Sequence, residues 1–217
     1  MSEQSEQQGR SLEVVVAFLI AIVTVIGAVI AWRAAVADDG AGDADFGGLR
    51  AAINLEEARA VNNLNAFEHY AAFADYKRYD ALGTALEETA GEAPSEETAR
   101  EMAEVNDLTV AKQNAFPNKF LNRDGSYGLQ RELGEMLADA AKEKDLNPEP
   151  QFAEADRLRG KTLQLLLSIT VLGVALVLYT LIESVSGRLQ QYLLLGAGSL
   201  LALAASAYAV FVDVVAR

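Results

Sequence analysis

Three stretches of the chain contain no charged side chain, namely Val14–Trp32, Thr162–Ile182 and Leu189–Val212, of 19, 21 and 24 residues. As helices they would be roughly 28, 32 and 36 Å long, whereas the hydrocarbon core of a bilayer is about 30 Å thick. Uncharged runs of this length are rare in soluble helices. The pattern therefore predicts three membrane-spanning helices, at residues 12–36, 161–183 and 191–214, with a short turn at 184–190 between the last two.

A polar segment at residues 37–160 separates the first two predicted spans. Its apolar residues recur at helical spacing, and no alternating β pattern is present. The longest such pattern runs from about Leu49 to Thr89, and further helices are predicted at 96–115, 129–145 and 152–161, the last continuing into the second span. The fold expected is an all-α membrane protein: three transmembrane helices, with an antiparallel helical bundle inserted between the first and the second.

Two segments near the first span are expected to lack regular structure. Residues 1–11 are polar and predict a mobile tail, and the Gly/Asp-rich stretch 38–48 predicts a flexible hinge. The first apolar run is longer than the 7–15 residues typical of the core of a cleaved signal peptide. We therefore expect it to be retained as a span.

The net charge of the chain, −13, lies entirely within residues 37–160, which hold 26 acidic and 13 basic side chains. A surface of this kind repels nucleic acid, so no nucleic-acid partner is expected. The chain has no cysteine, which excludes disulfides, thiolate metal sites and a cysteine nucleophile. The apolar runs contain no ionisable side chain, which argues against proton-coupled transport and voltage sensing.

Two motifs partly resemble sites of chemistry. His69, the only histidine, has no metal-ligating side chain three or four residues away on its helix, so neither a metal site nor a general base is expected there. The loop Asn122–Ser126 has the turn of a calcium loop, but Phe120 and Arg131 occupy the two anchor positions that require carboxylates. No cofactor and no metal is therefore predicted.

The residues expected to matter are instead those that pack helices together. Ile53, Leu64, Phe67, Tyr70 and Phe73 are predicted to form either the core of the bundle or a face that binds a partner, with Phe67 buried against a neighbouring helix. In the third span, small residues recur every four positions and allow close helix approach. The partner of this small-residue face is either the second span of the same chain or a neighbouring subunit; its residues are Gly198, Ala202 and Ser206.

The order of these parts resembles that of small three-span bacterial membrane proteins with a helical insert, a family without a known activity. The resemblance rests on the segment FPNKFLNRDGSYG and on DLNPEPQFAEADRLRGK, which leads into the second span. It implies the same architecture and no catalytic residue.

Together these observations predict a non-enzymatic integral membrane protein with a structural or interaction role, as an oligomeric or accessory subunit of a membrane complex. Its expected partners are the lipid bilayer and either further copies of itself or other membrane-protein subunits. The alternative is an oligomeric pore or a ligand-sensing membrane protein. The basic residues near the spans, with the long insert left out of the count, favour a multi-pass protein of the cell membrane, with a cytoplasmic N-terminus and an extracytoplasmic segment at 37–160.

Overall fold

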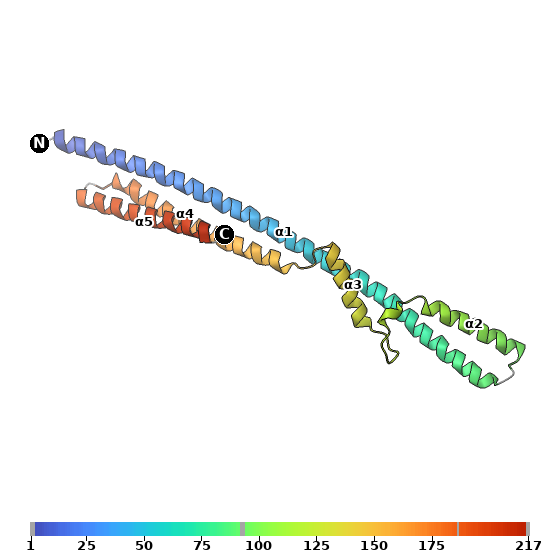
Figure 1. Ribbon diagram of the computed structural model, residues 1–217. Coiled ribbons are helices and arrows are strands. Elements are labelled where there is room, and N and C mark those ends of the chain that lie inside the picture. The colour runs from blue at the N-terminus through green and yellow to red at the C-terminus, as the bar shows by residue number, and fades with distance from the viewer. Residues whose placement is uncertain (1–2, 92–93, 186, 216–217) are drawn as a thin grey trace. The chain divides into compact units, whose positions relative to one another are not determined.

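The computed structural model describes residues 3–91, 94–185 and 187–215, with side chains from Leu12 onward. These residues form five α-helices and one 3-10 turn, and the described part of the chain contains no strand (Figure 1). The all-α prediction is confirmed. In chain order the elements are α1 (Glu3–Ala90), α2 (Glu96–Gln113), η1 (Asn118–Phe120), α3 (Leu129–Glu143), α4 (Glu149–Ile182) and α5 (Arg188–Val215).

The chain divides into two compact units, which are described separately. We call Met1–Leu49 with Glu149–Arg217 the apolar unit, and Arg50–Pro148 the acidic unit. Helix α1 contributes its first part to the apolar unit and residues 50–90 to the acidic unit.

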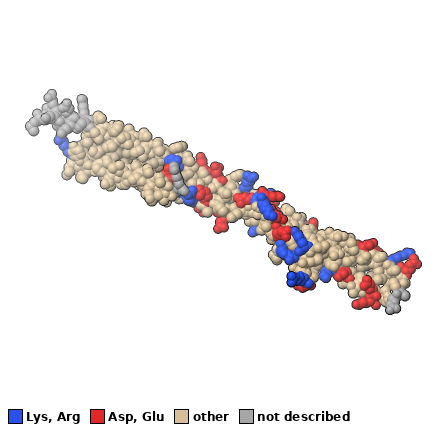
Figure 2. All heavy atoms as spheres, viewed as in Figure 1, with Lys and Arg blue, Asp and Glu red and all other residues tan. Residues whose placement is uncertain are grey.

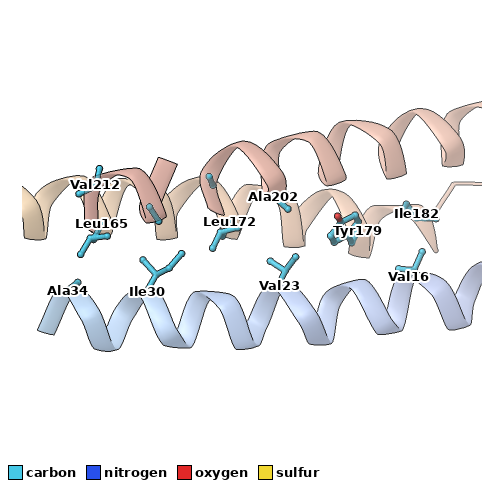
Figure 3. Packing of buried hydrophobic residues seen from close by; sticks show 13 residues of the cluster. Val16, Val23, Ile30, Ala34, Leu165, Leu172, Tyr179, Ile182, Ala202 and Val212 are labelled. Atoms are coloured by element: carbon cyan, nitrogen blue, oxygen red, sulfur yellow. The ribbon is translucent and has the colours of Figure 1, made fainter. Parts of the chain in front are cut away.

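In the apolar unit, α1, α4 and α5 pack through residues spaced seven apart. Val16, Val23 and Ile30 of α1 point toward Leu165, Leu172 and Tyr179 of α4 (Figure 3). Gly198, Ala205 and Val212 supply the equivalent row on α5. A seven-residue repeat is typical of helices that pack at a small left-handed crossing angle.

The outward sides of these helices are apolar as well as the inward sides. Phe18, Leu167 and Leu203 are examples of large exposed side chains, one from each helix. Each of the three helices is long and apolar enough to cross a membrane, and the three uncharged runs fall within them. A helix that is apolar all round is typical of a protein core or of a membrane span.

The predicted hinge at residues 38–48 is wrong, because this stretch is an uninterrupted part of α1. Two of its glycines lie against α4: a Cβ on Gly48 would lie 2.6 Å from the Cε1 atom of Phe152, and one on Gly40 would lie 3.3 Å from the Cδ1 atom of Leu158. Asp45 also forms a salt bridge with Arg159 of α4. The absent side chains let α4 approach closely, and this packing holds a glycine-rich segment in a helix.

Other boundaries were predicted more closely from local signals. Ser95 caps α2, and its Oγ accepts a hydrogen bond from the backbone N–H of Thr98 at 3.2 Å. Pro150 occupies the first turn of α4. Backbone N–H groups in the first turn have no partner within the helix, so the lack of an N–H in proline costs no hydrogen bond there. Helix α4 then continues without a break to Ile182, as predicted. The predicted tail differs, because α1 already begins at Glu3.

In the acidic unit, α3 and α2 lie one after the other along α1, and each runs antiparallel to it (Figure 1). Near the start of this part of α1, Lys144 donates a hydrogen bond to Glu57 at 2.9 Å. Further along α1, Lys112 of α2 donates to Asp75 at 2.6 Å. Each stretch of α1 therefore has one helix beside it, which leaves the opposite side of α1 uncovered.

Candidate functional site

The most unusual surface of the acidic unit is the uncovered side of α1. Ile53, Leu64 and Phe67 are 66%, 59% and 69% exposed. At 100° per residue these three positions lie within about 60° of one another around the helix, together with Ala60 and Ala71, which are also exposed. We call these five residues the outer face of α1. Monomeric soluble surfaces rarely carry large apolar side chains in a contiguous row, so such a face marks a site of interaction.

The prediction that Phe67 packs against α2 or α3 is therefore wrong. Helix α3 contacts the other side of α1, where His69 meets Glu132 and Ala66 is buried. Among the described residues no second helix lies alongside this stretch, so the outer face remains exposed there. Of the five residues predicted as bundle core or partner face, only Phe73 is buried, at 9% exposure. The ring of Tyr70 contacts that of Phe73 but remains largely exposed.

Phe73 belongs to an aromatic cluster that joins α1 to the segment between α2 and α3. Its ring centroid lies 5.6 Å from that of Phe116, edge to face, and 5.4 Å from that of Tyr127, nearly stacked. Phe120 completes the cluster through an edge contact with Tyr127 at 6.4 Å. These separations are typical of favourable aromatic pairs.

The loop before α3 presents Tyr127 to this cluster through a tight turn. Leu121 and Tyr127 form an isolated antiparallel bridge. Within the turn, Asp124 accepts hydrogen bonds from the hydroxyl of Ser126 at 2.7 Å and from its backbone N–H at 3.0 Å. These two bonds, the hydroxyl bond first, hold the pKa of the Asp124 carboxyl below its usual value. Gly125 has a φ of +77°, which glycine adopts without strain.

Beneath the aromatic cluster lies a buried carboxylate that the sequence did not reveal. Glu132 in the first turn of α3 is 1% exposed. One of its oxygens lies 2.5 Å from Nδ1 of His69, and the other accepts a hydrogen bond from the Tyr127 hydroxyl at 2.9 Å. Burial, followed by this hydrogen bond, raises the pKa of Tyr127 above its usual range. The partner of His69 was missed because it comes from a helix 63 residues later.

The His69–Glu132 contact fixes the imidazole and ties α1 to α3. A carboxylate that orients an imidazole also occurs in acid–base catalysis, but there the second ring nitrogen faces a nucleophile or a substrate. Within the described part of the chain, no hydroxyl is hydrogen-bonded to His69, and no three His, Asp or Glu side chains gather closely enough to hold a metal ion. The contact ties α1 to α3, and together with Tyr127 it gives both oxygens of the buried Glu132 a polar partner.

In the apolar unit, Gly198 of the small-residue face of α5 packs on α4 of the same chain. A Cβ on Gly198 would lie 2.8 Å from the Cε1 atom of Tyr179, whose hydroxyl is 3.1 Å from Oγ of Ser199. Ala202 is buried, and Ser206 is half-buried with its hydroxyl bonded to the carbonyl of Ala202. Of the two partners considered for this face, the second span occupies Gly198.

Comparison of the chain with models of known families, with curated proteins and with solved structures finds no match. The function is therefore inferred from the residues of the chain itself.

Proposed function

We propose that this chain is an integral membrane protein that acts by assembly, as a subunit of a membrane complex, and not by catalysis. The outer face of α1 is the observation that carries the proposal. Three large apolar side chains of this face are 59–69% exposed on the acidic unit: Ile53, Leu64 and Phe67. Burial of apolar surface yields about 25 cal/mol per Å², so covering such a row favours association.

The chemistry around the outer face is consistent with a protein partner. Glu57 and Glu68 border it on one side and Glu56 on the other, and Glu57 and Glu56 form salt bridges with Lys144 and Arg59 within the unit. An apolar centre with a charged rim is the usual anatomy of a protein interface. A lipid surface would instead favour a basic rim.

Membrane insertion, the other half of the proposal, is supported by the apolar unit. Its three helices are apolar on their outward as well as their inward sides. Exposure of the outward sides to water is unfavourable, whereas the hydrocarbon core of a bilayer accommodates them. The acidic unit is inserted between the first and second of these helices in the chain. It is thereby tethered to a span at both ends.

A photo-crosslinking experiment in native membranes tests the assembly role. A photoreactive amino acid placed at position 67 should give a discrete crosslinked product of the full-length chain, because this side chain would lie in the contact. The same amino acid at Val110, an exposed residue of α2, is the matched control. No product at position 67, or identical products at both positions, would refute the assembly role.

We further propose that the acidic unit lies outside the cytoplasm, with the N-terminus inside. The chain has no cysteine, so a single Arg123→Cys variant provides a unique label in an exposed loop. A membrane-impermeant thiol reagent should label it on intact cells. Labelling only after the cells are lysed would place the acidic unit in the cytoplasm.

A further inference from the structure

A cluster of three charged side chains connects all three helices of the apolar unit at one end of their shared core. Asp213 of α5 accepts hydrogen bonds from one guanidinium nitrogen of Arg33 in α1, at 2.7 and 2.6 Å. The ammonium of Lys161 in α4 lies 2.8 Å from the same carboxylate. Two cations thus share one anion, and the cluster has a local surplus of one positive charge.

A groove of about 360 Å³ ends at this cluster. Its walls come from α1 and α5, and Leu165 of α4 lies at its base. Except for Ser206 and the Arg33–Asp213 pair, its lining is aliphatic: Ile26, Val29, Ile30, Leu165, Ala209, Val210 and Val214. The space-filling view shows how few charged side chains interrupt the apolar unit before this end (Figure 2).

We propose that this groove binds one alkyl chain of an anionic phospholipid, with the lipid phosphate held by Arg33, which lines the groove. Lys161 does not line the groove, and its side chain is 11% exposed; it contributes the surplus positive charge by sharing Asp213 with Arg33. The inference rests on the membrane insertion proposed above. Trp32, next to Arg33, is exposed, and exposed tryptophans on spans lie at the level of the headgroups. A basic pocket between spans at that level has the chemistry that recognises anionic headgroups. The aliphatic walls suit the alkyl chain.

The shape of the groove argues against a partner helix as its occupant. On α1 the lining runs only from Ile26 to Arg33, which is roughly 10 Å of helix. A transmembrane partner would follow the outer surface over the full hydrocarbon thickness of about 30 Å. A short apolar groove with a cationic end matches one chain and one headgroup.

Acidic residues further along α1 limit the preference of the groove for an anionic lipid. Asp38 and Asp39 are exposed and lie five and six residues beyond Arg33, roughly 8 Å along the helix axis. They are too far to pair with Arg33 but close enough to weaken the local potential. One surplus basic charge near a membrane surface corresponds to about a fivefold preference for an anionic lipid.

The test is a lipid titration of the full-length protein in mild detergent, followed by native mass spectrometry. Phosphatidylglycerol should bind about fivefold more tightly than phosphatidylcholine with the same acyl chains. Arg33→Gln removes the surplus charge and should abolish the preference, whereas Asp213→Asn raises the surplus and should keep or increase it. Arg188→Gln, at the start of α5, is the charge-matched control and should change nothing.

A second pair of variants tests the groove itself. Val29→Trp places a large ring in the groove and should weaken both lipids equally. Val174→Trp makes the same change at an exposed position of α4 outside the groove and should leave binding unchanged. Equal binding of both lipids by the unmodified protein, or loss of thermal stability by Arg33→Gln and Asp213→Asn without any change in lipid preference, would overturn the inference.

Failure of the inference is distinguishable from failure of the proposed function. If alkaline carbonate releases the chain from membranes, the insertion on which both proposals rest is refuted. If the chain stays embedded and shows no lipid preference, only the lipid site is refuted.

Discussion

Phe73 and Phe67 offer a matched test of the architecture of the acidic unit. The two residues lie six positions apart on α1, and Phe→Ala removes the same atoms from each. Phe73 is 9% exposed and contacts three aromatic rings, with centroid distances of 5.4 Å to Tyr127, 5.6 Å to Phe116 and 6.2 Å to Tyr70. Phe67 is 69% exposed. The substitutions should therefore differ greatly in cost.

The expected magnitudes follow from burial. Replacing a buried phenylalanine by alanine costs about 3–5 kcal/mol, and we expect the lower part of this range because the cluster lies in a thin unit whose neighbours can partly close the cavity. Replacing an exposed side chain that contacts nothing within the chain costs less than about 1 kcal/mol. The difference should be at least about 2 kcal/mol.

Amide hydrogen exchange in the full-length protein measures this difference locally. In Phe73→Ala, exchange should accelerate roughly 10²- to 10³-fold in residues 116–143, because these segments close over Phe73 and open more readily without it. In Phe67→Ala, protection of the same residues should be nearly unchanged. Equal acceleration in both variants would refute the placement of α3 relative to α1.

Three further predictions follow from individual contacts. Gly48→Ala should destabilise the apolar unit by about 1–3 kcal/mol relative to Gly42→Ala, because only at position 48 does the new methyl meet an aromatic ring of α4; thermal unfolding in detergent compares them. His69→Leu should cost about 3 kcal/mol in acidic-unit stability by leaving one oxygen of the buried Glu132 without a partner, and His69→Gln should cost less because its amide still donates; exchange protection of α3 measures both. Ser126→Ala should raise the pKa of Asp124 toward its ordinary value, observed by NMR titration. Because the folded-state pKa is lowered, the support that Asp124 gives the turn is present at neutral pH and is lost as the pH falls through that pKa.

Properties that depend on a single stretch of chain could be predicted from the sequence. Membrane-spanning length follows from an uncharged run, and the three runs fall within α1, α4 and α5. Ser95 begins α2 because its side chain satisfies a backbone N–H three residues later. The helix that leads into the second span was predicted from Phe152, and it starts three residues earlier, at Glu149, because Pro150 fits the first turn of a helix.

The flexible hinge predicted at the glycine-rich residues 38–48, just after the first span, is wrong for the converse reason. Glycine in isolation favours a turn, since it costs a helix about 1 kcal/mol relative to alanine. In the folded chain, Gly48 lies against Phe152, and the close contact that it permits offsets this cost. The neighbour that decides the outcome is about 100 residues away in the sequence.

Tertiary structure alone decided which side of α1 is the core. The sequence spaces Ile53, Ala60 and Phe67 seven residues apart, and it spaces Ala66 and Phe73 seven apart on the opposite side. Periodicity shows that a row of residues shares a face, but it does not show which face α3 covers. The position of α3 is set by contacts that cross between helices, above all Glu132 with His69 and Tyr127. Such contacts join residues whose separation in sequence has no fixed period, and only the folded chain brings them together.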